Sequence, residues 1–149
     1  MVFCLDQKVR EKELVININD SLDPGTLALV DTKSFGMNVF GNILTNAIKF
    51  SFRGSTIDVS LEEKETGILV SIQDYGSGMP ESLQKQIFEP DIATTRKGTE
   101  GEAGTGFGMP IVKSYLDRLD GDIEVRSSNI EEFPEDHGTC FNIHLKKAA

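Results

Sequence analysis

Three polar side chains are expected on one face of a helix predicted for residues 34–50. On such a helix Asn42, Asn46 and Lys49 fall within an arc of about 60°, beside the apolar stripe of the same segment. An asparagine in an exposed helix interior costs up to ~0.7 kcal/mol relative to alanine, and Glu or Lys would serve a solvated face better. The stretch NILTNAIKFS, residues 42–51, therefore indicates a polar site. Helix propensity alone leaves an ordinary solvated face open as the alternative.

A carboxylate is expected to point into the core where a predicted strand ends. Asp74 continues the alternation of Val70 and Ile72, so it lies on the same side of the strand as those apolar residues. A buried carboxylate needs a donor, and either a ligand amino group or the backbone NH groups of the following turn would serve. Gly76 and Gly78 fit both interpretations, because a positive φ and a close approach of backbone to a ligand both favour glycine.

A glycine-rich loop leads into a predicted helix near the C-terminal end of the chain. Gly104, Gly106 and Gly108 precede an amphipathic segment, and Pro110 is compatible with its first turn. The free NH groups and the positive dipole end of such a helix suit a phosphate. The loop is not a Walker motif and misses the dinucleotide fingerprint, since neither spacing is present. A flexible connection is the simpler alternative.

The elements that position these residues follow from hydrophobic periodicity. A first strand is predicted to point Leu14, Ile16 and Ile18 to one side. The helix 34–50 carries apolar residues at helical spacing, which are Met37, Phe40, Ile43, Leu44, Ala47 and Ile48. The remaining predicted elements are a hairpin with strands around 57–61 and 68–74, a short helix from Pro80, a loop over 90–104, a helix over 107–119, and strands over 122–128 and 138–147.

Strands joined by short turns and interleaved with helices predict an α+β fold. We expect a two-layer α/β sandwich, with a mixed, mostly antiparallel sheet of about five strands covered on one face by about three helices. At 149 residues and 38% hydrophobic composition, one domain spanning 1–149 is expected to fold without metal or disulfide staples.

Composition excludes several function classes. A net charge of −9 without a basic stripe argues against nucleic acid as a partner. Cys4 and Cys140 form no CxxC pair, which favours a reducing, cytoplasmic setting over a zinc ribbon or a disulfide framework. No apolar run approaches the roughly 20 residues that span a bilayer, and the first residues do not resemble a signal peptide. The sequence predicts a soluble chain.

Taken together and in order, these stretches resemble the nucleotide-binding boxes of the sensor histidine kinase catalytic domain. That domain belongs to an ATPase superfamily with a Bergerat-type fold, which includes DNA gyrase and the ninety-kilodalton heat-shock chaperone. NILTNAIKFS is similar to the N box, DYGSGMP to the first G box, IFEP to the F box and GTGFGMPIVK to the second G box. The resemblance runs from about Leu14 to Lys146, and the joint match is far more specific than any single box.

The resemblance implies a Mg-ATP site with ADP as the product. Asn46 would bind Mg²⁺ with help from Asn42, and Lys49 would contact phosphate, with Asn42 and Lys49 as the catalytic residues. Asp74 would accept a hydrogen bond from the adenine amino group, and Gly76 and Gly78 would let the base approach the backbone. Further implied nucleotide contacts are Phe50 over the base or ribose, Thr139 through water, Arg96 or Lys97 of the lid on the phosphates, and Met79, Gly104, Thr105, Gly106, Phe107 and Gly108.

Asparagine at position 42 separates two chemistries within that superfamily. Its ATPases carry glutamate there to activate water, and an amide has no useful basicity for that step. Phosphoryl transfer instead needs positioning and charge stabilisation. We therefore expect transfer of the γ-phosphoryl group to a histidine on a separate helical dimerisation domain, and from there indirectly to a response regulator. His137 and His144 are expected to be incidental surface residues.

Two alternatives keep the same fold. One is a serine kinase like the anti-sigma factors, and the other is a regulatory module that binds nucleotide without transferring phosphate.

Some positions depart from the family pattern: Asp91 follows IFEP where an aromatic residue is frequent, and Phe107, Met109 and Pro110 replace the usual residues of the second G box. The isolated domain is expected to be a cytoplasmic monomer without direct membrane contact, including where it forms the cytoplasmic part of a membrane-bound receptor.

Overall fold

The computed structural model describes residues 2–91, 96–104, 106 and 108–148. Thr105 and Phe107, two of the predicted nucleotide contacts, lie outside these residues. The helices are α1 (Val2–Glu11), α2 (Thr32–Phe35), the π-helical turn η1 (Gly36–Phe40), α3 (Gly41–Phe50), α4 (Glu81–Gln84) and α5 (Gly108–Arg118). The strands are β1 (Val15–Asp20), β2 (Thr56–Lys64), β3 (Gly67–Asp74), β4 (Asp122–Ser128) and β5 (Gly138–Leu145).

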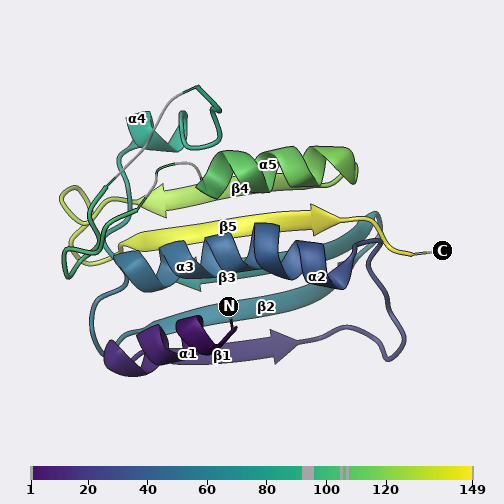
Figure 1. The fold of residues 1–149 in the computed structure, drawn as a ribbon, viewed down its shortest axis with the longest axis horizontal. Helices are drawn as coiled ribbons and strands as arrows, with labels where there is room; N and C mark the ends of the chain where they lie inside the picture. Colours follow the sequence, from purple (N-terminus) through teal and green to yellow (C-terminus); the bar gives the residue numbers. More distant parts are fainter. Residues whose placement is uncertain (1, 92–95, 105, 107, 149) are drawn as a thin grey trace.

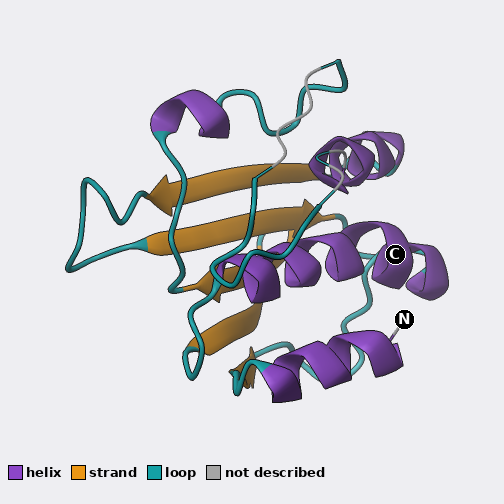
Figure 2. Cartoon of the chain, turned by 60° about the vertical axis from the view of Figure 1, so that its left-hand side comes forward, coloured by secondary structure: helices purple, strands orange, loops and turns teal. Residues whose placement is uncertain are grey.

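The five strands form one mixed sheet in the order β1-β2-β3-β5-β4. β1 and β2 are parallel, and the other three neighbouring pairs are antiparallel. The predicted hairpin is β2 and β3, and its register places Val59 opposite Ile72. α1, α3 and α5 lie over the same face of the sheet (Figures 1 and 2). The predicted two-layer α+β fold is therefore confirmed.

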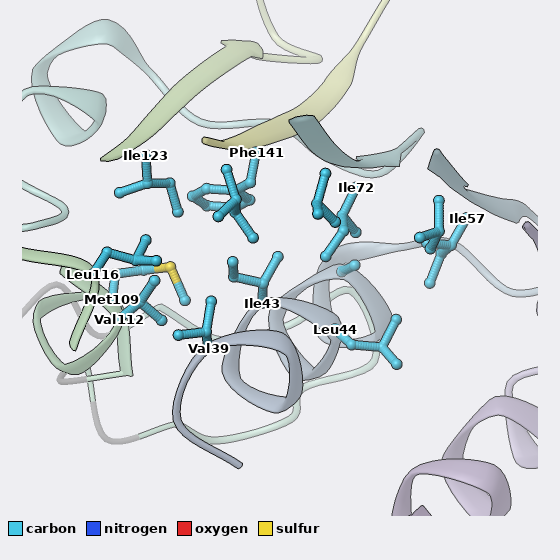
Figure 3. Packing of buried hydrophobic residues seen from close by; sticks show 14 of the residues in the cluster. Val39, Ile43, Leu44, Ile57, Ile72, Met109, Val112, Leu116, Ile123 and Phe141 are labelled. Carbon is cyan, nitrogen blue, oxygen red and sulfur yellow. The ribbon is translucent and has the colours of Figure 1, made fainter. Parts of the chain in front are cut away.

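The hydrophobic core lies between the sheet and this helical layer. Alternate residues of the central strands point into it, and Ile57, Ile72 and Ile143 are almost completely buried. From the helices, Ile43 of α3 and Val112 of α5 belong to the same buried cluster, and Figure 3 shows both on the helical side, facing the strand residues above them. Close packing of these side chains holds the helices against the sheet, because a shift of either layer would open a void.

Truncation of Ile43 is expected to show how much this core stabilises the fold. Ile43→Ala removes a fully buried side chain and leaves a cavity, so we expect a loss of about 3 to 4 kcal/mol in the free energy of unfolding. Met37→Ala, in the same continuous helix but with Met37 52% exposed, should change it by less than about 1 kcal/mol. Urea denaturation measures both values, and similar losses for the two variants would contradict this packing.

The predicted helix 34–50 is present as one continuous helical segment, but it contains a π-turn. The NH of Gly41 bonds to the carbonyl of Gly36, five residues earlier, which defines η1. Val39 lies four residues before Ile43 and so shares the core-facing side of the helix, whereas Met37 points away from it. Val39 is completely buried, whereas Met37, which we predicted on the apolar stripe, is half exposed. Asp31 caps the start of the segment, because its side chain accepts a hydrogen bond from the NH of Ser34 at 2.7 Å.

The N-terminal region differs most from the sequence analysis. Helix α1 was not predicted. Leu14 is buried and Ile16 is half-buried as expected, but Ile18 is 70% exposed, so the predicted inward alternation of the first strand is wrong at its end. β1 is an edge strand, and α1 covers only its first part (Figure 1). Among the described helices, none is both long and apolar enough to cross a membrane.

Candidate functional site

The predicted polar residues meet at a cavity of about 240 Å³ on the helical side of the sheet. It lies between α3, the end of β3, the starts of β5 and α5, and residues 96–104 and 106. Its lining residues are Asn42, Thr45, Asn46, Lys49, Phe50, Asp74, Met79, Leu83, Ile87, Arg96, Ala103, Gly104, Gly106, Gly108, Met109, Thr139 and Phe141. Residues that are more than 90 positions apart in the sequence thus share one site.

Helix α3 contributes its polar face to the cavity. Asn42, Asn46 and Lys49 line it together, as the helical spacing predicts, while Ile43 and Ala47 of the same helix are buried in the core. The side-chain NH₂ of Asn42 donates to the carbonyl of Asn38 at 2.8 Å. The amide oxygen of Asn42 is consequently the end that lies towards Gly108 at the start of α5.

Asp74 is the buried acid of the site. Its side chain is 3% exposed, which confirms that it faces the core. The NH groups of Gly76 and Thr139 donate to Oδ1 at 2.9 and 3.3 Å, so the backbone of the following turn supplies one of the two donor types predicted for it. Among the described residues, none donates to Oδ2. Burial raises the pKa of Asp74 to about 6 although both NH groups oppose this rise.

The raised pKa of Asp74 predicts a specific pH dependence of stability. The folded state binds the proton more tightly than the unfolded state, whose ordinary value is 3.8. The stabilising contribution of this group to the free energy of unfolding is therefore complete below about pH 3.8 and is lost as the pH rises through about 6. The difference between the two pKa values corresponds to a loss of about 3 kcal/mol. Asp74→Asn cannot titrate, so its advantage in unfolding free energy over the wild type should grow between about pH 4 and pH 6.5. Urea denaturation across this range checks it, and a constant difference would contradict it.

Gly76 and Gly78 do not line the cavity. A side chain at Gly76 would overlap the carbonyl of Phe50, and one at Gly78 would overlap the carbonyl of Ser128. Gly78 also has a φ of +65°, which favours glycine. Packing of the turn against α3 and β4 thus accounts for both glycines, and an approach of a base to their backbone stays a prediction.

Two cationic side chains lie at one aromatic ring of the cavity. The guanidinium of Arg96 is 4.3 Å from the ring centroid of Phe50, and Nζ of Lys49 is 4.9 Å from it. Arg96 also donates to the carbonyl of Gly78 at 3.0 Å. Burial, and next the charge of Arg96, lower the pKa of Lys49, against the opposing effect of Glu102. A bound anion would relieve this unfavourable burial of two like charges. Lys97, the other predicted lid residue, is exposed and does not line the cavity.

The glycine-rich segment forms another wall of the cavity. Gly104, Gly106 and Gly108 all line the cavity, Gly106 has a φ of +79°, and α5 begins at Gly108. The start of this helix places backbone NH groups and a positive dipole end at the cavity. The predicted loop from 90 to 104 contains no helix or strand among its described residues.

An apolar wall completes the site. Met79, which was predicted, and Met109 are buried there, and the sequence analysis missed Leu83, Ile87 and Phe141 as lining residues. Ile87 belongs to the IFEP stretch, which was the available signal for it. Thr139 lines the cavity with its hydroxyl 2.7 Å from that of Ser127. The cavity therefore combines an apolar wall, one acid and two cations.

The two histidines differ in their surroundings. His144 is exposed, as predicted. His137 is not an incidental surface residue, because its ring is half-buried, Nδ1 lies 2.6 Å from the carbonyl of Gly76, and the ring packs edge-on against Phe52. The loop before β5 folds back over the turn after β3, which no local sequence pattern indicated.

Comparisons with known proteins agree with this architecture. Among curated proteins, the chain is 32% identical over 141 residues to the sensor protein VanSC of Enterococcus gallinarum, covering 95% of the chain and 36% of that protein. It is 32% identical over 139 residues to the autoinducer 2 sensor kinase/phosphatase LuxQ of Vibrio harveyi, covering 90% of the chain and 15% of that protein. The chain thus spans about a third or less of these two relatives.

Solved structures share the fold. The mycobacterial sensor histidine kinase MprB has a TM-score of 0.73 at 24% identity, covering 99% of this chain and 94% of that one. The catalytic domain of histidine kinase ThkA, in a nucleotide-free form, has a TM-score of 0.75 at 21% identity, covering 97% and 86% of the two chains. The family model for histidine kinase-, DNA gyrase B- and HSP90-like ATPases matches residues 32–149. The resemblance found in the sequence is confirmed, and the chain belongs to this ATPase family.

Proposed function

We propose that this chain binds Mg-ATP in the cavity and transfers the γ-phosphoryl group to a histidine on a separate helical dimerisation domain. The observation that carries the proposal is the composition of the cavity wall. A buried carboxylate, Asp74, and two partly buried cations, Lys49 and Arg96, line one cavity together with the glycine-rich start of α5, and Arg96 is close enough to Asp74 to lower the pKa of that acid. An adenine needs an acceptor for its amino group, and a triphosphate needs cations and backbone donors, so this set of residues suits both parts of the nucleotide.

The purine end of the cavity is built to select an amino group. Oδ1 of Asp74 is held by two backbone NH groups, which leaves Oδ2 to accept a hydrogen bond from the adenine amino group. Met79 and Ile87 offer apolar surface to the faces of the base. Phe50 and Thr139 line the same cavity and would complete the contacts with base and ribose.

The phosphate end combines charge with backbone donors. Lys49 and Arg96 would offset the negative charge of the triphosphate, and the NH groups at the start of α5 would donate to it. The amide oxygens of Asn46 and Asn42 are neutral ligands of the oxygen type that Mg²⁺ accepts, and they would hold the ion together with phosphate oxygens. The described residues contain no group of three His, Cys, Asp or Glu side chains suited to a metal, so asparagine and phosphate oxygens would form this site. Bound Mg-ATP supplies the phosphoryl group and the metal charge that stabilises its transfer.

The residue types favour transfer over hydrolysis. Asn42 lies at the cavity, and its amide cannot take a proton from water. Lys49, Arg96 and the asparagines would position and neutralise the phosphates while the acceptor enters from another domain. The name of the relative LuxQ, a sensor kinase/phosphatase, supports a kinase. A histidine acceptor, a response regulator downstream and a cytoplasmic location belong to the same proposal.

A transfer assay with an added acceptor tests this proposal. The chain is mixed with a helical hairpin that carries a histidine and with ATP labelled at the γ-phosphate. We expect an acid-labile, alkali-stable phosphoryl group on the hairpin, and its loss when the histidine is replaced by alanine. An acid-stable product on serine would favour the serine kinase alternative. Binding of ATP without transfer to either residue would favour the regulatory module.

A further inference from the structure

The last turn of α3 is a junction of three distant segments. The carbonyls at the end of a helix lack intrahelical partners and must find donors elsewhere. The carbonyl of Phe50 accepts the NH of Ser77, from the turn after β3, at 3.0 Å. The carbonyl of Lys49 accepts the NH of Thr99, from the segment before the glycine-rich loop, at 3.1 Å. The helix that carries the asparagines therefore also anchors the segments around the cavity.

A third segment reaches this junction through a buried cation. Lys12, just after α1, is only 4% exposed. Its Nζ lies 2.8 Å from the carbonyl of Ile48, 2.9 Å from that of Lys49, and 2.6 Å from Oε2 of Glu102. All three ammonium donors are thus used, and the charge lies at the negative end of the helix dipole. A buried ammonium persists only with such complete pairing, so this contact is specific rather than incidental.

Glu102 transmits the contact to the cavity wall. Its Oε1 accepts the NH of Glu100 at 2.8 Å, and its carbonyl accepts the NH of Gly98 at 2.9 Å, which closes a compact turn. The next two residues, Ala103 and Gly104, line the cavity. Gly104 lies directly against the ammonium of Lys49. The position of the wall beside Lys49 therefore depends on where Glu102 is held.

We propose that Lys12 is a positioning residue for the nucleotide: together with Glu102 it clamps residues 98–104 against the end of α3 and so fixes the wall that faces the phosphates. The inference rests on the proposed function for its effect on ATP, but the clamp itself is a property of the nucleotide-free chain. It couples α1, which lies outside the cavity, to the geometry of the site. Lys12 does not line that cavity, so its effect on ATP acts through Glu102.

Hydrogen exchange with matched variants tests the clamp. Lys12→Met removes the ammonium and keeps the length of the side chain, and Glu102→Gln removes the opposite charge with little change in shape. Glu100→Gln is the control, because it breaks the ion pair of Glu100 with Arg53, 2.7 Å long and exposed on both sides, within the same turn. Amide exchange of the peptide 97–104 is measured without nucleotide, and the dissociation rate of an ATP analogue is measured separately.

We expect Lys12→Met and Glu102→Gln each to accelerate amide exchange of peptide 97–104 about tenfold. The exchange rate of the double variant should be close to that of either single variant, because the two residues form one contact. Glu100→Gln should stay within about twofold of the wild type. Dissociation of the analogue should accelerate in the same two variants, and a cooperative urea transition of Glu102→Gln, at a lower midpoint than that of the wild type, would show that this variant is folded at the start of the experiment. If Lys12→Met fails to fold, Glu102→Gln decides the outcome.

The two proposals fail in different ways. Unchanged exchange in Glu102→Gln, or an equal effect of Glu100→Gln, overturns the clamp whether or not ATP binds. Accelerated exchange in a chain that binds no ATP supports the clamp as a structural contact and overturns both its role towards the nucleotide and the proposed function. Accelerated exchange with an unchanged dissociation rate overturns the positioning role alone.

Discussion

Asp74→Asn is expected to weaken ATP binding about a hundredfold without destabilising the fold. Two backbone NH groups hold Oδ1 of Asp74, so the asparagine must turn its oxygen towards them and its NH₂ towards the cavity. That donor would face the adenine amino group, which is itself a donor. Loss of a charge-assisted hydrogen bond costs up to about 3 kcal/mol, about a hundredfold in Kd. Isothermal titration calorimetry at about pH 7.5 measures the change.

The fold itself provides the control for this variant. Because burial raises the pKa of Asp74 to about 6, the ionised carboxylate destabilises the folded state at neutral pH, and Asp74→Asn should unfold at the same or a higher urea concentration than the wild type. Inosine triphosphate, which lacks the amino group, should bind the wild type weakly and lose little affinity in the variant. An unchanged Kd for ATP in a folded variant would contradict the role of Asp74.

Asn46→Ala is expected to reduce phosphoryl transfer by about two to three orders of magnitude. Asn46 lines the cavity one turn after Asn42, on the face of α3 that also carries Lys49, and its amide oxygen is the proposed ligand of Mg²⁺. Without it, the metal charge at the transferring group would be lost or misplaced. Single-turnover transfer to an added histidine-bearing hairpin, with a titration of Mg²⁺, measures this effect.

Asn38→Ala is the matched control for Asn46→Ala. Asn38 belongs to the same continuous helical segment but does not line the cavity, and the carbonyl that accepts the Asn42 amide belongs to its backbone. The transfer rate of Asn38→Ala should stay within about threefold of the wild type. Equal losses in the two variants would show that helix integrity, rather than metal binding, explains the effect.

Local patterns predicted the acid, the polar helix face and the glycine-rich wall of the cavity, and the family resemblance added Phe50, Met79, Arg96 and Thr139. The alternation along β3 placed Asp74 inward, and helical spacing brought Asn42, Asn46 and Lys49 together, because both patterns depend only on backbone geometry. The hairpin of β2 and β3 and the glycine-rich start of α5 followed from residue types that are strongly tied to turns and strands. Eleven of the predicted nucleotide-contact residues line the cavity, namely Asn42, Asn46, Lys49, Phe50, Asp74, Met79, Arg96, Gly104, Gly106, Gly108 and Thr139.

The features that the sequence did not predict depend on distant contacts. Nothing in the local sequence distinguishes Lys12 from a solvated lysine, because its partners Ile48 and Glu102 lie 36 and 90 positions away. The sequence places His137 in an acidic turn, and its contact with the carbonyl of Gly76 joins residues 61 positions apart. The segment Gly36–Phe40 is a π-turn, although the apolar spacing alone favours a regular helix. Tertiary packing overrides local preference at each of these places.

Calorimetric titration of the wild-type chain with ATP, in the presence and absence of Mg²⁺, is the decisive experiment for this cavity. We expect one ATP per chain, an affinity that falls when Mg²⁺ is removed, and no comparable heat with GTP. A folded chain that releases no heat of binding with Mg-ATP, or that binds GTP as tightly, would contradict the assignment of this cavity to adenine nucleotides.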